Sequence, residues 1–126
     1  MDQGATASKI LIGVPLYGYS WAGAKTVCES STGPGKVPTY DYRALPTNGS
    51  EKDQVNEDAI ACCTYNPQNN EVVTWDNPTV GTLKGQWIKS CELGGAFFWE
   101  LSGDSRSGDP TPSLVKTVCD AMNKQE

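Results

Sequence analysis

The stretch "GGAFFWELSGD", residues 94–104, decides the fold. Two glycines precede a short apolar run, and polar residues follow it at once. A short apolar run bounded by turn residues is typical of a strand that is buried in a parallel sheet. Because successive side chains of a strand point to opposite faces, Phe97 and Trp99 should share one face and Phe98 should lie on the other. The stretch therefore predicts a strand that ends by presenting an indole beside Glu100.

A second run of this kind, "KILIGVP" at residues 9–15, is β-branched and nearly continuous in apolar character, as expected of another covered parallel strand. Between the two runs the chain changes character. The Gly/Pro/Ser-rich stretch "SSTGPGKVP", residues 30–38, predicts loops and short strands. Further along, "EDAIACCTYNPQNNEVVTWDNP" predicts an antiparallel hairpin around the turn "NPQNN" at residues 66–70.

Two helices are predicted, each from a start signal. Asn77 can cap a helix that has Pro78 in its first position, with apolar residues recurring at Val80, Leu83, Trp87 and Ile88. Thr111 and Pro112 repeat that signal before a helix carrying Leu114, Val115, Val118 and Met122 on one side. The order of buried strand, antiparallel insert, helix, buried strand and helix predicts an α+β chain that ends like an alternating β/α protein.

Composition narrows the function classes. The 126 residues carry a net charge of −5 and no Lys/Arg cluster, which argues against nucleic acid and anionic membranes as partners. Five cysteines without C-x-x-C spacing, and no histidine, argue against a metal site, and no cofactor is expected. Paired cysteines and the sequon at Asn48 favour a secreted or extracellular protein, whereas five reduced thiols in a cytosolic protein are the alternative.

"KILIGVPLYGYSW", residues 9–21, resembles the seventh barrel strand of family 18 glycoside hydrolases, whose usual form is close to "GxPxYGRxW/F". "TWDNPTVGTLKGQWIKSCELGGAFFWELSGD", residues 74–104, resembles the stretch that follows in the family, with its "YDDP"-like helix start and its eighth strand "GGxMxW". Fungal chitinases share the "WES/WEL…D" ending. The resemblance implies the last two β/α units of an incomplete TIM barrel. These units flank an antiparallel sheet and helix of the chitinase-insertion type.

The domain boundaries follow from that resemblance. Residues 1–16 would be the seventh strand, residues 17–76 the insertion subdomain, and residues 77–126 the helix, eighth strand and final helix. The resemblance also implies three substrate-binding residues. Trp99 would be the platform under the sugar, Tyr17 would contact substrate at the mouth of the cleft, and Tyr19 stands where the family usually has an arginine. A phenol cannot supply the five-donor fork of a guanidinium. The alternative interpretation is that these aromatics pack a core.

The acid catalyst of the family comes from a "DxxDxDxE" motif, and no acidic cluster in this sequence has that spacing. The nearest candidate, "SEKDQVNED" at residues 50–58, is polar and should be solvated. Glu100, on the opposite strand face from Trp99, is expected to be structural. We therefore expect no hydrolysis of chitin by this chain. Two functions stay open: the C-terminal part of a chitinase, or a non-catalytic protein that binds chitin or N-acetylglucosamine oligomers.

Barrel geometry also suggests how the cysteines pair. Cys91 and Cys119 would lie on adjacent outer helices and are the first predicted pair. Cys62 and Cys63 face opposite sides of one strand, so at most one of them can meet Cys28. Two parallel strands without barrel neighbours would expose apolar faces and edges. We therefore expect self-association, pairing with the missing half of the barrel, or refolding of both strands onto the insert.

Overall fold

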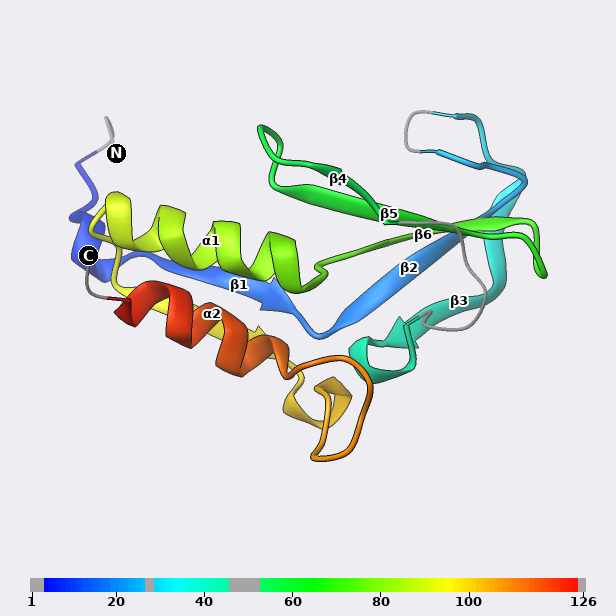
Figure 1. Ribbon diagram of the computed structural model, residues 1–126. Helices are drawn as coiled ribbons and strands as arrows, with labels where there is room; N and C mark the ends of the chain where they lie inside the picture. The colour runs from blue at the N-terminus through cyan, green and yellow to red at the C-terminus, as the bar shows by residue number, and fades with distance from the viewer. Residues whose placement is uncertain (1–3, 27–28, 46–52, 125–126) are drawn as a thin grey trace.

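The computed structural model describes residues 4–26, 29–45 and 53–124, and Figure 1 shows two sheets set side by side. Cys28, Asn48 and Glu51 lie outside the described residues. A two-stranded parallel sheet pairs β1 (Leu11–Pro15) with β7 (Gly95–Trp99). A five-stranded sheet has the order β3-β2-β6-β5-β4. Its members are β2 (Tyr17–Ala22), β3 (Gly33–Asp41), β4 (Gln54–Asn56), β5 (Ala61–Asn66) and β6 (Glu71–Trp75).

Helices α1 (Pro78–Ser90) and α2 (Leu114–Asn123) lie against one face of the parallel sheet (Figure 1). Single 3-10 turns occupy Ala7–Lys9, Tyr42–Ala44 and Leu101–Gly103. Phe98 packs against the main core, whereas Phe97 and Trp99 are exposed, so the predicted alternation along this strand is confirmed. β1 and β7 pair with each other and not with the insert, so the refolding alternative is wrong for this structure.

The insert contains the predicted hairpin. β5 and β6 pair antiparallel from Cys62 opposite Trp75 to Asn66 opposite Glu71, with the turn between them. Residues 30–38, predicted to form loops and short strands, contribute to β3, which runs from Gly33 to Asp41 and is longer than expected. β3 lies at the edge of the sheet, where prolines are tolerated because one side of the strand needs no ladder hydrogen bonds. Its register with β2 shifts between Tyr19 and Trp21.

The start of α1 is as predicted, since the Asn77 side chain accepts a hydrogen bond from the Val80 amide at 2.9 Å and Pro78 is in the first turn. The predicted apolar stripe is partly wrong. Trp87 is 43% exposed, while Gly81 and Gly85 are buried against α2. A Cβ at Gly85 would lie 2.6 Å from the Ala121 Cβ, so the missing side chains let the helices approach closely.

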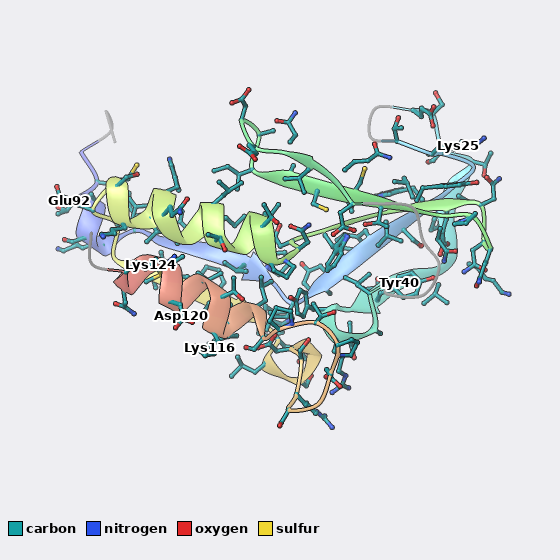
Figure 2. The ribbon with its side chains drawn as sticks, viewed as in Figure 1. Lys25, Tyr40, Glu92, Lys116, Asp120 and Lys124 are labelled. Atoms are coloured by element: carbon teal, nitrogen blue, oxygen red, sulfur yellow. The ribbon has the colours of Figure 1, made fainter. Side chains whose placement is uncertain are left out.

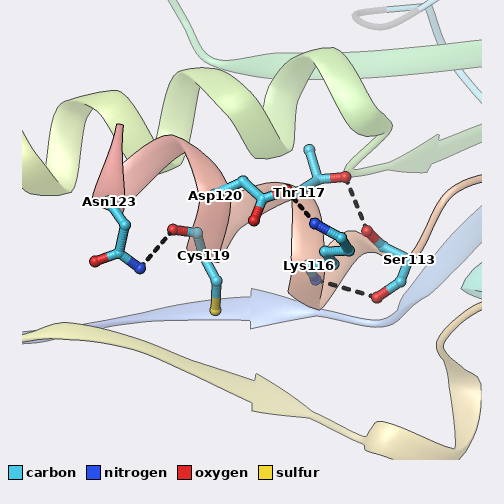
Figure 3. A network of polar contacts seen from close by, with 6 residues as sticks. All are labelled: Ser113, Lys116, Thr117, Cys119, Asp120 and Asn123. Atoms are coloured by element: carbon cyan, nitrogen blue, oxygen red, sulfur yellow. Dashed lines mark hydrogen bonds and ion pairs between the residues drawn. The ribbon is translucent and has the colours of Figure 1, made fainter. Parts of the chain in front are cut away.

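Helix α2 begins at Leu114, two residues after the predicted position. Ser113 caps it by accepting a hydrogen bond from the Lys116 amide at 3.1 Å, and Figure 3 shows this cap with its neighbours. Pro112 precedes the helix, and its carbonyl accepts a hydrogen bond from the Tyr42 hydroxyl at 2.8 Å. The charged side chains of Lys116 and Asp120 lie on the outer side of α2 (Figure 2), where they form an exposed ion pair.

One core joins the insert to the parallel sheet. It contains buried residues from both sheets and both helices: Val14, Leu16, Tyr42, Leu45, Cys62, Val73, Trp75, Val80, Leu114 and Val118. Tyr42 is 1% exposed, and its ring lies 5.8 Å from that of Trp75. The pKa of the Tyr42 phenol is raised, mainly because the phenol is buried. In the described part of the chain, no helix has the length and apolar character needed to cross a membrane.

Candidate functional site

A hollow of about 250 Å³ opens where the two sheets meet. It is lined by residues from β1, β2, the β4–β5 connection, β5 and β6: Pro15, Tyr17, Tyr19, Ile60, Ala61, Cys62, Thr74, Trp75 and Asp76. Two of these, Tyr17 and Tyr19, are residues that the sequence assigned to substrate. A hollow with aromatic walls and a few polar groups is the usual form of a small-ligand site.

Tyr17 and Tyr19 project from the same face of β2 because they are two residues apart. Their rings meet edge to face with centroids 5.4 Å apart, and the Trp21 ring continues the row 6.5 Å beyond Tyr19. Tyr19 is 49% exposed, so its ring is open to a ligand. Burial raises the pKa of Tyr17, and its hydrogen bond and proximity to Tyr19 add to the rise.

Asp76 is the polar group of the hollow that sequence reasoning missed. It directly follows β6 and is 8% exposed, and its carboxylate is paired with the Lys84 ammonium from α1. Burial raises the pKa of Asp76, while the hydrogen bond and charge of Lys84 act in the opposite direction. No local pattern in "VVTWD" distinguishes this aspartate from an ordinary residue before a helix cap.

Trp99 stands at the carboxyl end of β7, directly opposite Pro15 of β1 in the parallel register. It is 68% exposed and is not among the residues that line the hollow. Pro15 does line the hollow, so Trp99 is the strand partner of one residue in the wall of the hollow. The structure thus brings Tyr17 and Tyr19 together in the hollow and places Trp99 outside its lining, on the parallel sheet opposite Pro15.

Glu100 follows Trp99 through a cis peptide bond. Its carboxylate accepts a hydrogen bond from the Ser102 hydroxyl at 2.5 Å, and its backbone carbonyl accepts one from the Gly103 amide at 2.9 Å. Both contacts belong to the 3-10 turn at Leu101–Gly103. Glu100 therefore holds the turn that follows the strand.

The acidic cluster of the insert is exposed where it is described. Asp53, Glu57 and Asp58 all lie at the surface. Asp53 accepts hydrogen bonds from the Thr64 hydroxyl at 2.6 Å and from the side-chain Nδ2 of Asn77 at 2.8 Å, so it ties β5 to the cap of α1. Within the described ranges, no group of three or more cysteine and acidic side chains could hold a metal ion.

The predicted bridge between Cys91 and Cys119 is not formed, since both are free thiols. The two helices meet through the buried glycines of α1 and through Leu114, Val118 and Ala121 of α2. Cys119 is one residue past Val118, about 100° around the helix, and its sulfur points away from α1 in Figure 3. Cys62 and Cys63 are also free, and they face separate buried clusters on opposite sides of β5 as predicted.

Comparison with known proteins agrees with this architecture. Residues 1–104 match the family model described as glycosyl hydrolases family 18. Chitinase 1 of Aphanocladium album is 31% identical over 130 residues, which covers 100% of this chain and 30% of that protein. Chitinase A1 of Niallia circulans is 34% identical over 117 residues, which covers 82% of this chain and 17% of that protein. The chain thus spans less than a third of the length of these two relatives.

Two solved structures show the same fold at low identity. Human YKL-39, a pseudo-chitinase with retained chitooligosaccharide binding, superposes with a TM-score of 0.83 at 24% identity, covering 98% of this chain and 37% of that one. A mutant of a class V chitinase from the plant Cycas revoluta, in complex with (GlcNAc)3, superposes with a TM-score of 0.78 at 24% identity. That match covers 95% of this chain and 35% of the plant protein.

Proposed function

The chain belongs to family 18 of the glycosyl hydrolases, and from this premise we propose that it supplies one wall and the sugar platform of a chitinase substrate groove. Its ligands would be chitin or N-acetylglucosamine oligomers. In this proposal the chain is the C-terminal part of a secreted, fungal-type chitinase, with residues 17–76 as the insertion subdomain. The alternative proposal is a non-catalytic protein derived from a chitinase that binds the same oligomers through the same surface.

The observation that carries the proposal is the exposure of Trp99. An indole that is 68% exposed at the carboxyl end of a parallel strand is unusual for a residue that could pack a core. A flat aromatic face can cover the C–H face of a pyranose while the sugar hydroxyls stay free to hydrogen-bond. Tyr17 and Tyr19 add two further rings on the adjoining sheet, one of them half exposed. Two rings in the hollow and an exposed indole on the neighbouring sheet favour a sugar over a charged or fully apolar ligand.

We propose that this chain alone does not hydrolyse chitin. The sequence carries no "DxxDxDxE" motif, and Asp53, Glu57 and Asp58 lie exposed at the surface. Hydrolysis in this family is substrate-assisted and needs a protonated glutamic acid beside the glycosidic oxygen. The chain would therefore act by binding, as a part of a larger site or by itself.

The test is a titration with the N-acetylglucosamine tetramer, following the Trp99 indole N–H by NMR. We expect millimolar affinity, about 4 kcal/mol on the standard scale, because a part of a groove supplies few of its contacts. Trp99→Ala should weaken binding by roughly 1.5–3 kcal/mol, the value of burying one large apolar face. Trp99→Phe, which keeps a ring, should retain most of the affinity. An indole signal that stays still at saturating sugar, in a folded protein, would refute the proposal.

A further inference from the structure

Asp76 has one carboxylate oxygen that the fold leaves unused. Its Oδ2 accepts from the Lys84 ammonium, but no described residue donates a hydrogen bond to Oδ1. Asp76 is nevertheless 8% exposed, and it lines the same hollow as Tyr17 and Tyr19. Among the described residues, Oδ1 is not one of the buried polar atoms that lack a partner, so solvent reaches this oxygen and it is free to accept a hydrogen bond from a ligand.

The fold holds this carboxylate in place from both sides. Trp75, the preceding residue, is fixed in the core by a hydrogen bond from its indole N–H to the Thr64 hydroxyl at 3.0 Å. Asn77, the following residue, caps α1 through the Val80 amide. With both neighbours fixed and Lys84 on its Oδ2, Asp76 has little freedom to turn away from the hollow. Such preorganisation is what gives a polar group in a binding site its selectivity.

We propose that Asp76 is a ligand-binding residue whose Oδ1 accepts a hydrogen bond from a hydroxyl or an acetamido N–H of the sugar that contacts Tyr17 and Tyr19. This inference rests on the proposed function, because it names a polar anchor of that sugar site. A carboxylate only accepts hydrogen bonds, so the partner must be a donor group on the ligand. The two phenol rings would cover the apolar face of the same sugar.

The charges around Asp76 agree with an ionised acceptor. The titratable groups that face it are the ammonium of Lys84 from α1, the phenols of Tyr17 and Tyr19 from β2, and the thiol of Cys62 from β5. Burial raises the pKa of the Cys62 thiol to about 12 and raises the pKa of Tyr17, so neither adds negative charge near neutral pH. Lys84 opposes the burial of Asp76 and favours its charged form.

The experiment compares Asp76→Asn with Asp120→Asn in titrations of the N-acetylglucosamine tetramer and of cellotetraose, followed by two-dimensional NMR. Asp120 is a matched control, since it is also paired with a lysine but lies exposed on α2. We expect Asp76→Asn to weaken binding of the N-acetylglucosamine tetramer about tenfold, the usual loss for a hydrogen bond to a charged group. Asp120→Asn should change it less than about twofold. Equal weakening for cellotetraose identifies a hydroxyl donor, and weakening for the acetylated sugar alone identifies the N–H.

Three results would overturn the proposal. Wild-type protein that binds the tetramer while folded Asp76→Asn binds it equally well refutes the role of Asp76 and leaves the proposed function standing. Wild-type protein that does not bind refutes both. If Asp76→Asn does not fold, the carboxyl carbon of Asp76 in wild-type protein is titrated with and without saturating tetramer. A donor from the sugar should lower the pKa of Asp76, and an unchanged titration would refute the proposal.

Discussion

Replacing Gly85 by alanine tests how closely the two helices must approach. An alanine Cβ at this position would lie 2.6 Å from the Ala121 Cβ and 2.7 Å from the Val118 carbonyl oxygen. Neither neighbour is the end of a flexible side chain, so the helices themselves must move apart. Overpacking of this kind costs typically 1–3 kcal/mol, and the better helix propensity of alanine offsets up to about 1 kcal/mol. We expect a net loss of about 1–2 kcal/mol in the free energy of unfolding.

The matched control is Gly81→Ala on the same face of α1. There the new Cβ would meet the Cδ1 of Leu114 at 2.5 Å, the far end of a side chain that can rotate. The gain in propensity should nearly cancel the strain, so Gly81→Ala should stay within about 1 kcal/mol of wild type. Urea unfolding followed by circular dichroism measures both. A Gly85→Ala protein as stable as Gly81→Ala, or more stable than wild type, would show that the helices are not held together by this close contact.

Three further expectations follow from the exposed strands, the cysteines and Asp76. The face of the parallel sheet that exposes Leu11 and Phe97 should drive self-association. Sedimentation equilibrium should show oligomers that Phe97→Glu disperses, and a strictly monomeric wild type would contradict this. In native protein at pH 8, iodoacetamide should label the half-buried Cys91 and Cys119 well before Cys62, whose buried thiol has a pKa raised to about 12, and equal labelling rates would contradict the burial of Cys62. Burial raises the pKa of Asp76 above its ordinary value of 3.8, so the folded protein favours the protonated carboxyl. The stability that this protonated carboxyl contributes is fully present below pH 3.8 and is lost as the pH rises through the raised pKa. Urea unfolding from pH 3 to 6 should therefore show the free energy of unfolding of Asp76→Asn increasing relative to that of wild type as the pH rises. A difference in free energy that stays constant with pH would contradict this prediction.

The elements that could be predicted from the sequence are those whose signals are local. Alternation in "GAFFW" sets Phe98 against the core and leaves Phe97 and Trp99 exposed, as the structure has them. The capping residue Asn77 and the turn at residues 66–70 are equally local, and both are in place. Each depends on backbone geometry over a few residues, so no distant contact is needed to establish it.

The features that could not be predicted depend on contacts between distant segments. β3 contains Gly33 and Pro34 and gives no strand signal, but its place at the edge of the sheet removes the objection to proline. Helix α2 begins at Leu114 rather than at Pro112, where Tyr42, far earlier in the chain, donates to the Pro112 carbonyl and Asp104 accepts from the Leu114 amide. Asp76 reads as an ordinary residue before a helix cap, and only the packing of α1 and β2 around it shows a buried carboxylate beside two phenols.

Leu16 explains how so short a chain can hold the parts of the site in register. It is the single residue between β1 and β2, hence between the sheet that carries Trp99 and the sheet that carries the two tyrosines. It is 1% exposed; its amide donates to the Trp99 carbonyl at 2.7 Å, and its carbonyl accepts from the Tyr42 amide at 2.9 Å. Gly103 packs directly on that carbonyl, where a Cβ would lie 2.4 Å away. These backbone hydrogen bonds inside the shared core join the end of β7 to the start of the insert, and they therefore help to fix the placement of Trp99 relative to Tyr17.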